Sequence, residues 1–180
     1  MKKTNLLKMA ALTSAILMTQ ISYGETVSVT DPQIVSSIQS QFSSDATTSG
    51  LHVDVSSLSG VVTLAGKVST DVEADKLIQI AESTPGVSDV SADNLTVKTS
   101  KHKMSDTMIT GKIKGMYVRE KLFGDKDISL MNVSVETTNG IVYLTGAVDT
   151  QDEATNAVKY AEEIHGVKKV DSKLTVKATS

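Results

Sequence analysis

The sequence of 180 residues contains no cysteine and no tryptophan, and aromatic residues make up only 3% of it. Without cysteine the chain has no disulfide, no thiolate metal ligand and no cysteine nucleophile. The scarcity of aromatics removes the stacking platform on which single-stranded nucleic acids bind, and residues 25–180 are net acidic, with 15 basic and 21 acidic residues. We therefore expect no nucleic-acid partner, and cores built from Val, Leu, Ile, Ala and Met.

Long apolar runs are also scarce, and the longest lies near the start. Lys2, Lys3 and Lys8 surround the beginning of a mostly apolar stretch at residues 9–18, which small residues follow. This is the plan of a secretory signal peptide, and we expect residues 1–24 to be cleaved after Gly24. A single membrane anchor is the alternative, but the run is shorter than the ~20 residues that a span needs. The sequence therefore predicts an exported protein.

Charge is unevenly distributed along the rest of the chain. Residues 25–100 carry ten acidic and three basic residues, a net charge of −7. Residues 101–180 carry eleven acidic and twelve basic residues, a net charge of +1. A difference of this kind suggests two halves that have different partners.

One short pattern occurs twice in the sequence. Residues 60–66 read Gly-Val-Val-Thr-Leu-Ala-Gly, and residues 140–146 read Gly-Ile-Val-Tyr-Leu-Thr-Gly. Apolar residues alternate in both copies, which is typical of a half-buried strand. Asn139-Gly140, where the second copy begins, is a strong hairpin signal.

The surrounding signals repeat as well. Thr70-Asp71-Val72-Glu73 and Thr150-Gln151-Asp152-Glu153 both fit a capping box at the start of a helix. Each helix then carries an apolar stripe and ends near a Gly-Val, and a strand ending in Leu-Thr-Val-Lys follows. The repeat has a period of 80 residues from Gly60 to Val90 and slips by one before Leu95, which pairs with Leu174. Agreement over so many features indicates duplication.

These patterns predict an α+β protein of two tandem α-β-β-α-β units. Each unit is expected to hold a three-stranded mixed sheet with two helices packed on one face, because a tight turn makes two strands antiparallel and a helical crossover makes the third parallel. We place the units at residues 30–98 and 105–178, with a polar, basic linker at residues 99–104. Asp31, followed by Pro32, is expected to cap the first helix of unit one.

The repeated Gly-x-Val-x-Leu-x-Gly, the capped helix ending at Gly-Val and the strand ending in Leu-x-Val resemble the BON domain family. Two such domains behind a cleavable signal peptide resemble periplasmic proteins of Gram-negative bacteria. The resemblance implies a periplasmic binding module rather than an enzyme. It also implies links to osmotic and envelope stress, to phospholipid surfaces, and to chaperone-like assistance of outer-membrane or secreted proteins.

The first helix of the second copy is the best candidate surface. Its apolar residues span one arc, and basic residues border that arc on both sides, a pattern that suits an anionic headgroup layer. The alternative is that the arc packs on the sheet and the lysines face solvent. The first helix of the first copy has no basic residue between Asp31 and Phe42. The candidate lipid-binding residues are Lys112, Lys114, Met116, Tyr117, Arg119, Lys121 and Lys126.

Other chemical motifs are weak. His52 and Asp54 share a strand face, but a metal site needs a third and a fourth ligand. Ser100 and Lys103 match a serine–lysine string, but they stand in the expected linker, which offers no helix to hold them. We therefore predict no catalytic, metal or cofactor-binding residue. Two functions stay open: contact with anionic phospholipid or a membrane surface, and a periplasmic chaperone for unfolded outer-membrane or secreted proteins, which would use a free sheet edge.

Overall fold

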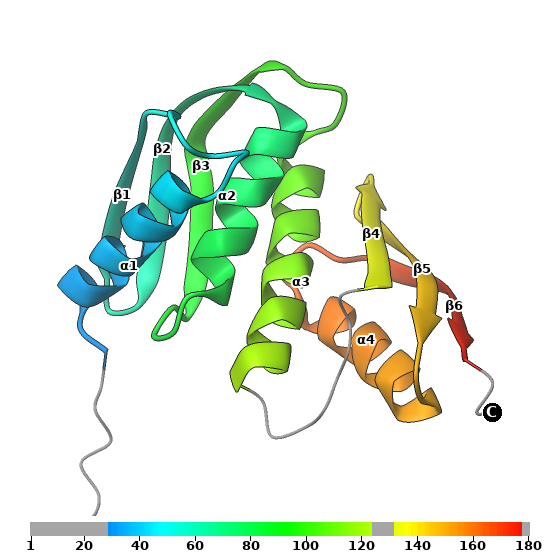
Figure 1. Cartoon of the computed structure of the whole chain (residues 1–180). Coiled ribbons are helices and arrows are strands. Elements are labelled where there is room, and N and C mark those ends of the chain that lie inside the picture. The colour runs from blue at the N-terminus through cyan, green and yellow to red at the C-terminus, as the bar shows by residue number, and fades with distance from the viewer. Residues whose placement is uncertain (1–28, 124–131, 178–180) are drawn as a thin grey trace, which may run out of the picture.

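The computed structural model describes residues 29–123 and 132–177, and within them two units of the same α-β-β-α-β order follow one another (Figure 1). The first unit contains α1 (Asp31–Ser44), β1 (Val53–Leu58), β2 (Val61–Thr70), α2 (Asp71–Ser83) and β3 (Asp89–Thr99). The second contains α3 (Met104–Phe123), β4 (Val133–Thr138), β5 (Ile141–Val148), α4 (Gln151–Glu163) and β6 (Lys169–Val176). The predicted α+β class and tandem units are confirmed.

Each unit has a mixed three-stranded sheet whose central strand is the one with the repeated motif. The strand orders are β1-β2-β3 and β4-β5-β6. In both sheets the hairpin pair is antiparallel and the pair joined by the helical crossover is parallel. The predicted topology is therefore confirmed in both copies.

The one-residue slip in the repeat is a bulge in β3. Thr63 pairs with Ser91, but Ala65 pairs with Asn94, so the pairing shifts by one residue between them. The corresponding β5–β6 pairing runs without a shift from Ile141 to Val148. The extra residue in the first copy is accommodated at the bulge, and regular pairing then continues with β3 shifted by one residue.

An aspartate at the start of each unit's first helix holds the hairpin turn of that unit. Asp31 accepts hydrogen bonds from the backbone N–H groups of Ser59 and Gly60 at 2.8 and 2.9 Å. Asp106 accepts from Asn139 and Gly140, both at 2.8 Å. Both residues of each turn have positive φ, the conformation of a type I′ hairpin. The expectation that Asp31 is an N-cap was wrong: Thr30 occupies that position, and the carboxylate of Asp31 reaches across to the turn instead.

The second helices begin at the predicted N-caps, with the full capping box in α2, whereas in α4 the Glu153 carboxylate accepts from the Asp149 N–H. The Thr70 hydroxyl accepts from the Glu73 N–H in α2, and the Thr150 hydroxyl accepts from the Glu153 N–H in α4. The Glu73 carboxylate in turn accepts from the Thr70 N–H. These bonds satisfy backbone donors that the first turn of a helix leaves free.

Two hydrophobic cores lie between the helices and the sheets. Ile34, Ile38 and Leu77 are fully buried in the first core, and Ile113, Val142 and Leu144 are fully buried in the second. The helix α3 lies between α2 and the second sheet (Figure 1). The expected signal peptide at residues 1–24 and Lys126 lie outside the described residues.

Candidate functional site

The candidate helix α3 packs on both units. Ile109, Ile113 and Tyr117 are buried in the second core, and the Tyr117 hydroxyl donates to the Ala157 carbonyl at 2.7 Å. Near its start, α3 packs Met104 and Met108 against the first core. The apolar arc that the sequence predicts therefore serves the second sheet, and part of the opposite side of the helix serves unit one.

Two glycines allow α3 to come close to α2. A Cβ at Gly111 would lie 2.8 Å from the Cβ of Ile78, and a Cβ at Gly115 would lie 2.5 Å from the Cβ of Glu82. Real Cβ atoms do not approach this closely, so a larger side chain at either position requires the helices to separate. Glycine is unfavourable in a helix interior by about 1 kcal/mol relative to alanine. Its presence here is explained by the close backbone approach that it permits.

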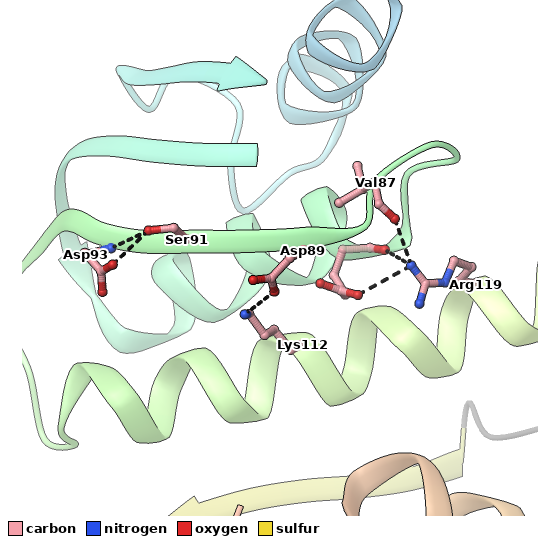
Figure 2. Close-up of polar contacts among 7 residues, drawn as sticks. Val87, Asp89, Ser91, Asp93, Lys112 and Arg119 are labelled. Atoms are coloured by element: carbon pink, nitrogen blue, oxygen red, sulfur yellow. Dashed lines mark hydrogen bonds and ion pairs between the residues drawn. The ribbon is translucent and has the colours of Figure 1, made fainter. Parts of the chain in front are cut away.

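Two lysines of α3 form ion pairs with acidic residues of unit one. Lys112 Nζ lies 2.6 Å from Asp89 Oδ1 at the start of β3, and Figure 2 shows the two side chains pointing toward each other. Lys114 Nζ lies 2.6 Å from Asp75 Oδ2 on α2. Asp75 is 18% exposed and Lys114 is 32% exposed, so solvent screens their pair less than a fully exposed pair. Lys112 is 11% exposed, but its partner Asp89 is 60% exposed, so solvent still reaches that pair.

Arg119 connects α3 to the end of α2 and to the chain that follows it. Its Nη1 lies 3.4 Å from Glu82 Oε1 and donates to the backbone carbonyls of Glu82 and Val87, each at 3.3 Å. The bond to Val87 is visible in Figure 2. One guanidinium thus contacts a side chain and two carbonyls, which suits its several fixed donors.

Burial at this contact changes the acid–base behaviour of two carboxyl groups. It raises the pKa of Glu82 to about 7, against the lowering effect of nearby Arg119 and Lys112, while the charge of Asp89 raises it further. Burial also raises the pKa of Asp75, and Lys114 opposes that rise. Within the described part of the chain, Asp75 Oδ1 is buried without a hydrogen-bond partner. Burial therefore makes the charged forms of Glu82 and Asp75 less favourable than they would be in water.

The structure divides the predicted lipid-binding residues into groups. Lys112, Lys114 and Arg119 contact unit one, Tyr117 is buried, and Met116 is half-buried against the second core. Lys121 is exposed at the C-terminal end of α3. Sequence reasoning missed the acidic partners of α3 on unit one. The signals that point to them are two glycines in the middle of a helix and the opposite charge of the two halves.

The last turn of α3 exposes large apolar side chains. Leu122 is 62% exposed and Phe123 is 60% exposed, directly after exposed Lys121. A groove of about 450 Å³ at this end is lined by residues of α1, by Ser83 at the end of α2, by Pro85 just after it, and by Val118 of α3. This end of α3 is therefore an apolar surface with an adjacent cation.

Across residues 29–123 and 132–177, three or more His, Cys, Asp or Glu side chains do not gather where an ion would fit. In the same ranges, no helix has both the length and the apolar content for crossing a bilayer.

The repeated unit matches a known domain family. The family model described as BON domain matches residues 30–99 and, a second time, residues 105–178. The chain belongs to the BON domain family. Both BON domains contain the hairpin, the crossover helix and the aspartate-held turn described above.

Two curated relatives resemble this BON chain over about two thirds of its length. Osmotically-inducible protein Y of Escherichia coli is 36% identical over 122 residues, which cover 65% of this chain and 58% of the relative. Outer membrane lipoprotein DolP of Haemophilus influenzae is 35% identical over 122 residues, which cover 66% of this chain and 60% of the relative. The match therefore spans about three fifths of each relative.

A solved structure also shows similarity. The C-terminal domain of CdsD, a structural protein of the type III secretion system of Chlamydia trachomatis, is 18% identical. The similarity covers 82% of this chain and 67% of that one, with a TM-score of 0.34.

Proposed function

We propose that this BON protein is a non-enzymatic protein of the bacterial periplasm that acts in osmotic or envelope stress by binding anionic phospholipid surfaces. The names of the two curated relatives, one osmotically inducible and one an outer-membrane lipoprotein, support an envelope setting. The observation that carries the lipid proposal is the exposed end of α3, where Lys121 precedes Leu122 and Phe123.

The chemistry of this end fits a membrane surface. Apolar side chains that stay in water gain free energy by entering the boundary between headgroups and acyl chains, at roughly 25 cal/mol per Å² of buried apolar area. A neighbouring lysine adds about 1 kcal/mol of attraction near an anionic surface. Because Lys112, Lys114 and Arg119 are engaged with unit one, this proposal rests on the last turn of α3 rather than on the whole helix.

Vesicle co-sedimentation tests this proposal. Vesicles containing phosphatidylglycerol should retain the protein, vesicles of phosphatidylcholine alone should retain much less, and added salt should weaken retention. Leu122→Ser with Phe123→Ser should reduce binding, and Lys121→Glu should reduce it further. Leu58→Ser is the matched control, since Leu58 is 77% exposed at the hairpin of unit one. Equal retention of the double serine variant and the control would refute this lipid site.

A second function, the holding of extended client proteins, is favoured by one observation. In the part of the chain that the structure describes, β1 pairs only with β2, so its outer edge has no strand beside it. A client segment can add to such an edge by backbone hydrogen bonds. Suppressed aggregation of an unfolded outer-membrane protein without lipid would support this function, and unchanged aggregation would exclude it.

A further inference from the structure

The contact of α3 with unit one covers a defined face of that unit. The face is formed by the outer side of α2 and the neighbouring part of β3. Ile78, next to Gly111 on this face, is fully buried. In β3 of the same unit, the core residue Ala92 is fully buried and the core residue Leu95 is 3% exposed. In this contact α3, the first helix of unit two, covers α2 and β3, the second helix and third strand of unit one.

The equivalent face of unit two is uncovered among the described residues. Val158 and Leu174 stand at the positions of Ile78 and Leu95, and both are only partly buried. Ser172, at the position of buried Ala92, is exposed. A groove of about 520 Å³ runs along this face of α4 and β6. Its lining residues include Thr155, Val158, Lys159 and Glu162, which correspond by the 80-residue period to Asp75, Ile78, Gln79 and Glu82.

The helix α1 presents a face that matches this groove. The first helices of the two units align with an offset of 75 residues, so that Ile34 and Ile38 correspond to Ile109 and Ile113. At the positions of Gly111 and Gly115, α1 carries Ser36 and Ser40, both small and both exposed.

We propose that a second copy of this chain docks its α1 on the α4–β6 face, in the way that α3 docks on α2 and β3 within one chain. The contact would continue the interface that already joins the two units, with small residues again permitting a close approach. It is heterologous, because α1 of one copy meets α4 of the next. Such a contact builds a ring or an open chain of molecules.

The charges at this contact indicate reversible rather than permanent association. None of the three ion pairs is kept at this contact. The pair of Lys114 and Asp75 is replaced by Gln39 and Thr155, which carry no charge, and the other two pairs lose their α3 cation, because Ser37 and Ser44 stand opposite Lys169 and Glu162. Within one chain, the linker also gives α3 a high effective concentration at α2, an advantage that a separate copy lacks. Self-association should therefore be weaker than the contact between units and should increase with protein concentration.

Engineered cysteines test the geometry, because the natural chain has none. The backbone of Gly111 lies beside Asp75 and Ile78, so Ser36→Cys in one chain should form a disulfide with Thr155→Cys in another. The control partner is Asp152→Cys. It is also exposed on α4, but it corresponds to Val72, which stays 67% exposed in unit one. We expect an abundant mixed dimer with the first pair and little with the second.

Sedimentation velocity on the natural chain provides a second measurement. The weight-average sedimentation coefficient should rise with concentration. Ser36→Arg should make association about tenfold or more weaker, because it places a bulky side chain at a close-packed contact. A monomer at every concentration would overturn the proposal. So would preferential disulfides between two Ser36→Cys chains or two Thr155→Cys chains, since these indicate an isologous contact.

Discussion

Burial of Glu82 couples the stability of this BON protein to pH. The Glu82 carboxyl has a pKa of about 7 in the folded chain, against an ordinary value of 4.5. Because the folded state binds this proton more tightly than the unfolded state, the contribution to stability is complete below about pH 4.5 and is lost as pH rises through 7. The ion pair with Arg119 reduces this effect without reversing its direction.

We predict that Glu82→Gln weakens the pH dependence of the unfolding free energy. The natural chain should lose on the order of 3 kcal/mol from this group between about pH 4.5 and about pH 8. The uncharged glutamine should not show that loss. Urea denaturation of both proteins at the two pH values measures it, and comparing the two proteins cancels the similar contribution of Asp75, whose pKa is also raised. Identical pH dependence in the two proteins would contradict the prediction.

Residue-level prediction from the sequence succeeded where the partner is close in the chain. The Thr70–Glu73 capping box is such a case, since both partners lie within one turn. The role of Asp31 was not predicted, because its partners Ser59 and Gly60 lie almost thirty residues away. Asp106 lies at the start of the first helix of unit two, and its carboxylate accepts from the turn residues Asn139 and Gly140. Comparison of the two copies would have revealed that Asp31 and Asp106 share this role.

At the scale of the element, α3 shows which of its packing faces the apolar periodicity predicts and which it does not. The stripe containing Ile109, Ile113 and Tyr117 predicts the face that packs on its own sheet. The basic residues that border this stripe were expected either to meet a lipid surface together with the stripe or to face solvent, whereas Lys112 and Lys114 pair with unit one. Nothing in a single helix shows that a second helix lies against it, although Gly111 and Gly115 spaced four apart are a signal of close approach.

Substitution of Gly115 by alanine tests this close approach. In an isolated helix the change should stabilise by about 1 kcal/mol. At the contact with α2, however, the new Cβ would meet the Cβ of Glu82 at 2.5 Å, so we predict destabilisation by roughly 1–3 kcal/mol. Thermal or urea unfolding gives the sign directly.

The repeat supplies a matched control for this substitution. Ser40→Ala places alanine at the equivalent position of α1, which is exposed. This change should alter stability by less than about 0.5 kcal/mol. If Gly115→Ala stabilised the protein as it would an isolated helix, α2 and α3 would not be in close contact in solution.

At the scale of the whole molecule, the charge difference between the halves has a structural use. The acidic half supplies Asp75 and Asp89, and the basic half supplies Lys112 and Lys114. Composition revealed the difference and suggested separate partners, but these charges face each other. Composition cannot distinguish the two cases, because it does not say which surfaces meet when two small domains fold side by side.

The arrangement of the two units should therefore depend on these pairs, while lipid binding should not. We predict that Lys114→Asp, which places two carboxylates together in a partly buried position, loosens the contact and increases the radius of gyration measured by small-angle X-ray scattering. The swapped variant, Asp75→Lys with Lys114→Asp, should restore much of the compact shape. Retention on phosphatidylglycerol vesicles should stay close to that of the natural chain in both variants, because Lys121, Leu122 and Phe123 are unchanged. A compact single variant that no longer binds vesicles would instead assign Lys114 to the lipid surface and contradict its role in joining the units.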